Sequence, residues 1–124
     1  MSVTIASVVA GLIGLAIVFI GARFLLAPQT AAAGFGVPYP PTGAPSPWLY
    51  TKGVRDIASG IFIAVLLVNR APHPLGAFLV AASLIPVGDA AIVLRSGGTR
   101  AAAFGIHGVT AAVMLAASAA LLIA

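Results

Sequence analysis

Apolar residues run along this chain in four long stretches, separated by connections that are richer in polar residues, glycine and proline. The stretches are Ser2–Ala27, Trp48–Val68, Leu75–Leu94 and Arg100–Ala124. A helix that crosses the hydrocarbon core of a bilayer needs about 20 apolar residues, and each stretch reaches that length. The pattern therefore predicts an all-α fold, an integral membrane up-down bundle of four helices that forms a single domain over residues 1–124.

The connections between the stretches differ in length. The second and third are short, so they force neighbouring helices to run antiparallel. The first, Pro28–Pro47, is long and rich in proline and glycine, so it is not expected to be helical beyond a turn near Gln29–Ala33. Long loops in compact domains are often lids or binding loops. We expect this loop to cover one end of the bundle, with Phe35 and Tyr39 as capping side chains.

The composition supports a location in the membrane. Hydrophobic residues make up 61% of the chain and charged residues only 6%, and the mean hydropathy is +1.18. A soluble domain has about 25% charged residues, so this chain has too few polar side chains to cover a surface in water. The first stretch lacks the basic n-region of a signal peptide and is longer than its apolar core, so we expect it to remain as a span.

Basic residues indicate an orientation. The formal net charge is +4, and in so apolar a chain it reflects membrane topology, so no nucleic-acid partner is expected. Five basic residues lie near the first and third connections, and one lies near the second: Arg23, Lys52, Arg55, Arg95 and Arg100 against Arg70. The positive-inside rule puts the first group in the cytoplasm. We therefore expect a multi-pass protein of the inner membrane with both termini outside.

Ionisable residues inside the four stretches lie at one depth. They are Arg23 near the end of the first, Arg55 and Asp56 two turns into the second, Asp89 near the end of the third and His107 two turns into the fourth. In antiparallel helices these positions lie roughly 5–12 Å below the same membrane face, at about 1.5 Å of rise per residue. Ionisable groups within a bilayer usually face the interior of a bundle. The sequence thus predicts a polar layer to which every stretch contributes.

Helical spacing adds further residues to this layer. Positions i, i+3, i+4 and i+7 of the second stretch form one polar stripe: Lys52, Arg55, Asp56 and Ser59. In the fourth stretch, Thr110 shares a face with His107. Pro86 removes a backbone donor three residues before Asp89, so we expect the third helix to open beside the polar layer.

Two interpretations of the polar layer stand side by side. In the first it is a site, with His107, Asp56 and Asp89 as acid/base groups, and with Arg23, Lys52, Arg55, Ser59 and Thr110 as ligand-binding groups. In the second it is a set of structural ion pairs, Asp56 with Arg55 or Lys52 and Asp89 with Arg23, beside a core histidine. No metal site and no cofactor are expected, because the sequence has no cysteine, no phosphate-binding glycine loop and few other metal ligands.

Small residues recur at four-residue spacing in two stretches. The first carries Ala6, Ala10 and Gly14, and the fourth carries Gly108, Ala112, Ala116 and Ala120. Helices in lipid associate through close approach of small residues, because lipid tails provide no hydrophobic drive. We expect these stripes to be packing seams, either within one molecule or between the copies of a homo-oligomer.

Four short segments together resemble the family catalogued as domain of unknown function 4267. They are Gly21–Phe24 with Ala27–Pro28, Lys52–Gly60, Ile85–Asp89 and Ala103–Gly108. The most specific pieces are Lys-Gly-Val-Arg-Asp in the second segment and Gly-Ile-His-Gly in the fourth. The family consists of small four-span integral membrane proteins, so the resemblance implies the same number of spans. It brings no established activity.

Three classes of function follow from these observations. The first is a bundle that binds a lipophilic molecule with an anionic or carbonyl head group. The three basic side chains of the layer, less its two acidic ones, give it a charge of +1 with His107 neutral. The second is a cofactor-free isomerase or hydratase in which His107 and an aspartate move protons. The third is a structural or accessory membrane subunit.

Overall fold

The computed structural model describes residues 1–37 and 45–124, and its regular structure over those residues is all helical. Two long helices are α1 (Val3–Leu26) and α3 (Pro47–Val68), and a short one, α2 (Pro28–Phe35), lies between them in sequence. A third rod consists of α4 (Pro72–Ala82) and α5 (Leu84–Arg95). A fourth rod consists of α6 (Arg100–Ala102), the π-helix η1 (Ala103–Gly108) and α7 (Val109–Leu122).

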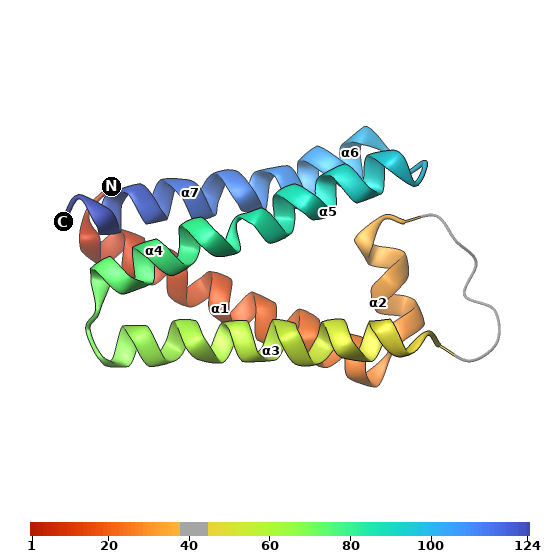
Figure 1. Cartoon of the computed structure of the whole chain (residues 1–124), viewed down its shortest axis with the longest axis horizontal. Helices are drawn as coiled ribbons and strands as arrows, with labels where there is room; N and C mark the ends of the chain where they lie inside the picture. Colours follow the sequence, from red (N-terminus) through yellow and green to blue (C-terminus); the bar gives the residue numbers. More distant parts are fainter. Residues whose placement is uncertain (38–44) are drawn as a thin grey trace.

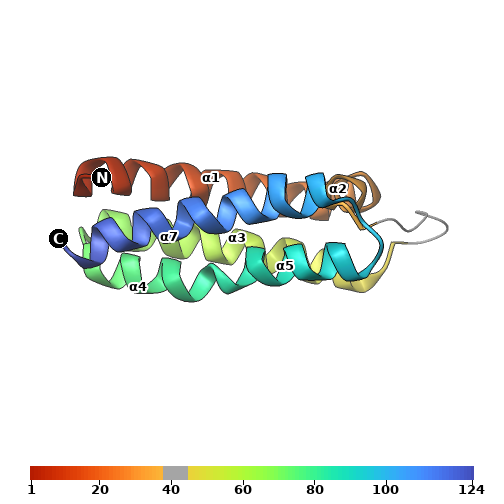
Figure 2. The ribbon, with the colours of Figure 1, turned by 90° about the horizontal axis from the view of Figure 1, so that it is seen from above.

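The four rods lie lengthwise beside one another (Figure 1). Both termini and the turn between α3 and α4 are at one end, which we call the terminal end. The short helix α2 and the turn between α5 and α6 are at the other, which we call the α2 end. Helices α1 and α3 form one pair, and the other two rods form a second pair. The pairs diverge toward the α2 end, where α2 lies between them, and the view from above shows the same lengthwise alignment (Figures 1 and 2).

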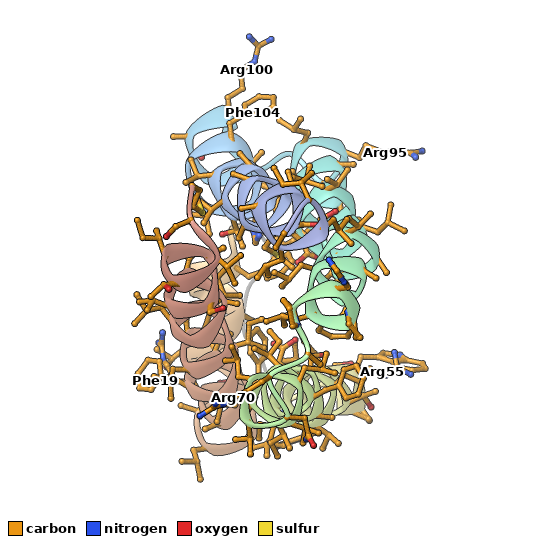
Figure 3. The ribbon with its side chains drawn as sticks, turned by 90° about the vertical axis from the view of Figure 1, so that its left-hand side faces the viewer. Phe19, Arg55, Arg70, Arg95, Arg100 and Phe104 are labelled. Atoms are coloured by element: carbon orange, nitrogen blue, oxygen red, sulfur yellow. The ribbon has the colours of Figure 1, made fainter. Side chains whose placement is uncertain are left out.

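Three of the four rods are long and apolar enough to cross a membrane. They are Val3–Leu26, Pro72–Arg95 and Arg100–Leu122. Helix α3 differs because its first half carries the charged residues Lys52, Arg55 and Asp56. Large apolar side chains also cover the outside of the rods, among them Leu15 and Phe19, which points away from the other rods in the end-on view (Figure 3). An outer surface of this kind agrees with a membrane protein.

The seam expected on α1 packs within the molecule. Ala6 and Ala10 are fully buried in the core, together with side chains of α3, α4 and α7. Further along, the backbones of α1 and α3 touch, because a Cβ added to Gly21 would lie 2.6 Å from the carbonyl oxygen of Gly53. A Cβ on Gly60 would lie 2.6 Å from the carbonyl oxygen of Gly14. Small residues thus let the backbones of these two helices come into contact.

The seam expected on the last rod is displaced. The buried face of α7 includes Ala111, Met114, Ser118 and Leu121. Of the predicted stripe, Ala120 is buried in the core, whereas Ala112 and Ala116 are exposed. Larger side chains, Met114 and Leu121, fill the interior on this side. The exposed alanines face away from the core, and their contact with a second copy stays a prediction.

Proline acts on the third rod as the sequence predicts. The rod is interrupted at Ser83, three residues before the buried Pro86. Proline has no backbone N–H, so it cannot donate to the carbonyl of Ala82. The hydroxyl of Ser83 donates to the carbonyl of Val80 at 2.6 Å, so this polar group has a partner one turn earlier in the same rod. The break lies six residues before Asp89, or about 9 Å further from the α2 end along the helix axis.

The first connection contains more helix than the sequence predicts. We expected one turn near Gln29–Ala33, but α2 covers Pro28–Phe35. Pro28 occupies the first turn, where a missing N–H costs nothing, and Gly36 ends the helix in the left-handed conformation with φ of 105°. The other prolines of the connection come only after this cap. Tyr39, expected as a capping side chain, lies outside the described residues.

Candidate functional site

A cavity of about 250 Å³ lies between the rods beneath α2. Side chains from α1, α2, α3, the α4–α5 rod, η1 and α7 line it. Every predicted site residue except Arg55 is among them: Arg23, Lys52, Asp56, Ser59, Asp89, His107 and Thr110. The structure therefore brings together residues that are far apart in the sequence, around one cavity.

The cavity is polar toward the α2 end and apolar toward the middle of the molecule. Four of the polar lining residues lie near the helix ends that are closest to α2: Arg23, Lys52, Asp89 and His107. The lining residues further from α2 are mainly apolar: Ile17, Ile63, Phe78, Ala82 and Met114. Phe35 of α2 covers the polar part, as the sequence analysis expected for this side chain. The result is an amphipathic cavity closed at its polar end by a short helix.

Arg55 does not belong to this cavity. Its side chain points outward from α3 in the end-on view (Figure 3), and the residue is exposed. Each helical residue advances about 100° around the axis, so Arg55 lies about 100° from Asp56, on the flank of the stripe. The expected ligand-binding role of Arg55 has no support in this position. The lining side chains then comprise two basic and two acidic groups, which gives a net charge of zero with His107 neutral, and not +1.

Lys52 and Asp56 form an ion pair inside one helix. The distance from Lys52 Nζ to Asp56 Oδ2 is 2.7 Å, and both side chains are largely shielded from solvent. Lys52 Nζ also lies 4.9 Å from the ring centroid of Phe24 and 5.4 Å from that of Phe35, where the aromatic faces stabilise its charge. Of the two partners that the sequence left open for Asp56, the structure shows Lys52.

His107 connects the cover of the cavity to its wall. Its Nε2 lies 2.8 Å from the carbonyl oxygen of Phe35, and the two rings lie 4.5 Å apart. A carbonyl oxygen only accepts, so Nε2 carries the hydrogen of this bond. The other ring nitrogen, Nδ1, lies 3.9 Å from Asp89 Oδ2. That distance is too long for a direct hydrogen bond and leaves Nδ1 and the carboxylate facing each other across a gap.

Arg23 lies at the rim of the cavity, where it is exposed. The expected ion pair between Arg23 and Asp89 is not present in the described part of the chain, because Asp89 faces His107 instead. Arg23 comes close to the end of α1, so its long side chain reaches the surface. Among the described residues Arg23 has no acidic partner, and its positive charge is not neutralised from within the cavity.

The match to a protein-family model spans all the residues around this cavity. The family model for a domain of unknown function, DUF4267, matches residues 14–121, which include every lining residue. The chain belongs to the DUF4267 family. No curated protein and no solved structure matches it.

The π-helix is the feature of this DUF4267 chain that sequence analysis missed. His107 lies in η1, a six-residue segment. Widened turns of this type occur mostly as short interruptions of α-helices, often at functional sites. The only signal in the sequence is Gly105 and Gly108, which flank His107 and weaken the α-helix locally.

A second missed feature is the docking of α2 onto the third and fourth rods. A Cβ on Gly36 would lie 2.9 Å from Cβ of Ala102, and a Cβ on Gly98 would lie 2.6 Å from the carbonyl oxygen of Gly36. Gly36 and Gly98 therefore allow the end of α2 to touch the turn between α5 and α6.

In the described ranges, no group of three or more His, Asp or Glu residues is placed to hold a metal ion.

Proposed function

We propose that this protein is a four-span membrane protein that binds a small amphiphile in the cavity beneath α2. The observation that supports the proposal is the division of one cavity into a polar end, with side chains from all four rods, and an apolar interior. Binding sites for small molecules typically combine mostly apolar walls with a few convergent polar groups. An amphiphile would place its apolar part toward Ile63 and Met114 and its head group beneath α2.

The charges of the lining residues indicate the class of head group. Lys52 is paired with Asp56, so neither offers a free charge. Arg23 at the rim is not paired with an acidic side chain within the described residues, so it favours a head group with a carboxylate or carbonyl oxygen. Ligand pockets usually measure about 300–1,000 Å³, and a cavity of about 250 Å³ suits a small or single-chain molecule.

Helix α3 is proposed as the fourth span despite its charged residues. Lys52 and Asp56 face the cavity and form a pair, so they are not presented to lipid. Arg55 lies within three turns of the α2 end, from which a long side chain can extend to the interface. With most basic residues at the α2 end, this end would face the cytoplasm of the inner membrane and both termini would lie outside.

Filling the apolar interior tests the binding proposal. Ala82 lines the cavity, whereas the neighbouring Ala81 is exposed and does not. We expect purified Ala82→Phe to lose the binding of cis-parinaric acid, a fluorescent single-chain carboxylate, and to retain fewer lipophilic molecules in extracts analysed by mass spectrometry. Ala81→Phe, the matched control, should bind like the wild type. Equal binding by Ala82→Phe and the wild type would contradict the proposal.

A second candidate function is acid/base catalysis on such an amphiphile. It is favoured by the gap between His107 Nδ1 and Asp89 Oδ2, where a ligand atom could exchange a proton with either group. The test is incubation of the purified protein with a membrane lipid extract in D₂O. Deuterium bound to carbon in a lipophilic product, present with the wild type and absent with Asp89→Asn, would support catalysis.

A structural or accessory role needs no cavity and would be indicated if neither binding nor exchange is found.

A further inference from the structure

We propose that the amphiphile reaches the cavity sideways from the bilayer, through an opening between α1 and the η1–α7 segment. This inference rests on the proposed function and extends it, since it assigns the ligand to the molecules of the membrane and not to those dissolved in the cytoplasm. The opening is defined by four lining residues: Ile20, Arg23, Ile106 and Thr110.

The exposure of the lining residues locates the opening. Ile20 is 42% exposed and Ile106 is 48% exposed, and Arg23 and Thr110 are also exposed. Other lining residues of the same helices are buried, for example Phe24 at 2% and Met114 at 2%. A residue that lines a cavity and is also exposed lies where the cavity meets the outside. These four residues come from the two facing elements α1 and η1–α7.

The α2 end of the cavity is covered. Phe35 lies over the polar part, and its carbonyl accepts the hydrogen bond from His107. The end of α2 is also fixed against the fourth rod, because Gly36 packs on Ala102. A ligand that approached along the axis of the molecule would have to displace these contacts, although Gly34 of α2 lines the cavity and is exposed.

The other sides between the rods are held by helix contacts or have fewer exposed lining residues. Helices α1 and α3 are in backbone contact at Gly21 and Gly53. Helices α3 and α4 are joined by an edge-to-face contact between Phe62 and Phe78, whose ring centroids lie 4.8 Å apart. On the side between α3 and α5, Ile85 of α5 is the exposed lining residue, and the lining residues of α3 are only partly exposed or buried. The side between α1 and η1–α7 has exposed lining residues on both facing elements, and the opening is assigned there.

The chemistry of the rim fits an amphiphile that lies in one leaflet. Ile20 and Ile106 are apolar, so they can face the hydrocarbon core without cost. Arg23 is near the end of α1, at the level where head groups lie, and it is free of an acidic partner among the described residues. A single-chain amphiphile could keep its head near Arg23 while its chain passes between Ile20 and Ile106. On this route the apolar chain of the ligand does not have to pass over polar side chains.

A bulky side chain at the rim tests this route. Ile106→Trp should narrow the opening. Val109→Trp is the matched control, because Val109 is 54% exposed, lies on the same rod and does not line the cavity. The binding and release of cis-parinaric acid by stopped-flow fluorescence would be followed in lipid nanodiscs. We expect Ile106→Trp to lower both the association and the dissociation rate constants by about ten-fold or more, since a barrier at the opening slows both directions. Val109→Trp should keep the wild-type rates.

The outcomes separate the two proposals. If the wild type binds the probe and Ile106→Trp shows the rates of Val109→Trp, the sideways route is wrong and the binding site stands. If the wild type does not bind the probe at all, the proposed function fails and the route falls with it. Ile20→Trp, compared with the outward-facing Phe19→Trp, gives the same measurement from α1 if Ile106→Trp does not fold (Figure 3).

Discussion

At the scale of a single residue, the two ring nitrogens of His107 face different groups. Nε2 holds α2 in place through the carbonyl of Phe35, and Nδ1 faces Asp89 inside the cavity. A histidine that only fills the core would need the first contact and not the second. Substitutions that preserve one contact and remove the other can therefore distinguish a structural role from a functional one.

We predict that His107→Gln keeps its stability and loses its function. A glutamine amide can still donate to the carbonyl of Phe35, but it cannot take up a proton near neutral pH. His107→Leu is the comparison, because it leaves that carbonyl without its donor and should reduce the free energy of unfolding by about 1–3 kcal/mol. Thermal melting in detergent and binding of cis-parinaric acid would be measured for both. Normal binding by a stable His107→Gln would indicate a structural histidine.

We also predict that Lys52 and Asp56 are coupled. Asp56→Asn should leave Lys52 without its acidic partner and lower the melting temperature, because a charge shielded from solvent is then uncompensated. The double variant with Lys52→Gln should recover part of the loss. The check is a double-mutant cycle from melting curves. Additive effects of the two single changes would show that the ion pair contributes nothing beyond its separate residues.

The sequence predicts a site residue where its depth along the helix and its position around the helix axis are enough to place it. Antiparallel connection is enough to bring Arg23, Asp89 and His107 to one level. Arg55 lies outside the cavity although it shares the predicted stripe, because spacing of i and i+3 covers a wide sector of a helix surface and packing decides which edge of that sector faces inward. The partner of Asp89 was also not predictable, because it depends on how far each side chain reaches between helices.

At the scale of helices, the closest contact is the one between α1 and α3. We predict that Gly21→Ala destabilises the protein by about 1–3 kcal/mol, because the new Cβ would lie 2.6 Å from a backbone oxygen that cannot move aside alone. Gly88→Ala is the control, since nothing lies within 4 Å of a Cβ at that position. Melting curves of the two variants would be compared. Equal melting temperatures would show that this contact is not tight.

The boundaries and interruptions of the helices were predictable to different degrees. Hydropathy located the four rods to within a turn, and Pro86 located the break at Ser83, because both depend on local chemistry. Helix α2 is longer than the proline-rich composition of the whole connection predicts, because every proline except Pro28 comes after Gly36. The π-helix had no clear signal, since it is stabilised by contacts between η1 and its neighbours that no local pattern encodes.

At the scale of the whole molecule, the distribution of basic residues predicts the orientation. The native chain has no cysteine, so single cysteines can report on each end. We expect Asn69→Cys, in the turn at the terminal end, to react with an impermeant thiol reagent on intact cells. Ser96→Cys, at the α2 end, should react only after the cells are made permeable. Both positions are exposed, so access to the reagent depends on the membrane. The reverse pattern would invert the proposed topology.

The divergence of the two helix pairs has a mechanical consequence. In the proposed orientation, the molecule has a larger cross-section in the cytoplasmic leaflet than in the outer one, because α2 lies between the pairs at that end (Figure 1). Lateral pressure from the lipids of that leaflet acts on the outer faces of both pairs and tends to press them together. The space available beneath α2 is then linked to how tightly the surrounding lipids are packed, and a membrane with bulkier or more loosely packed lipids would leave it wider.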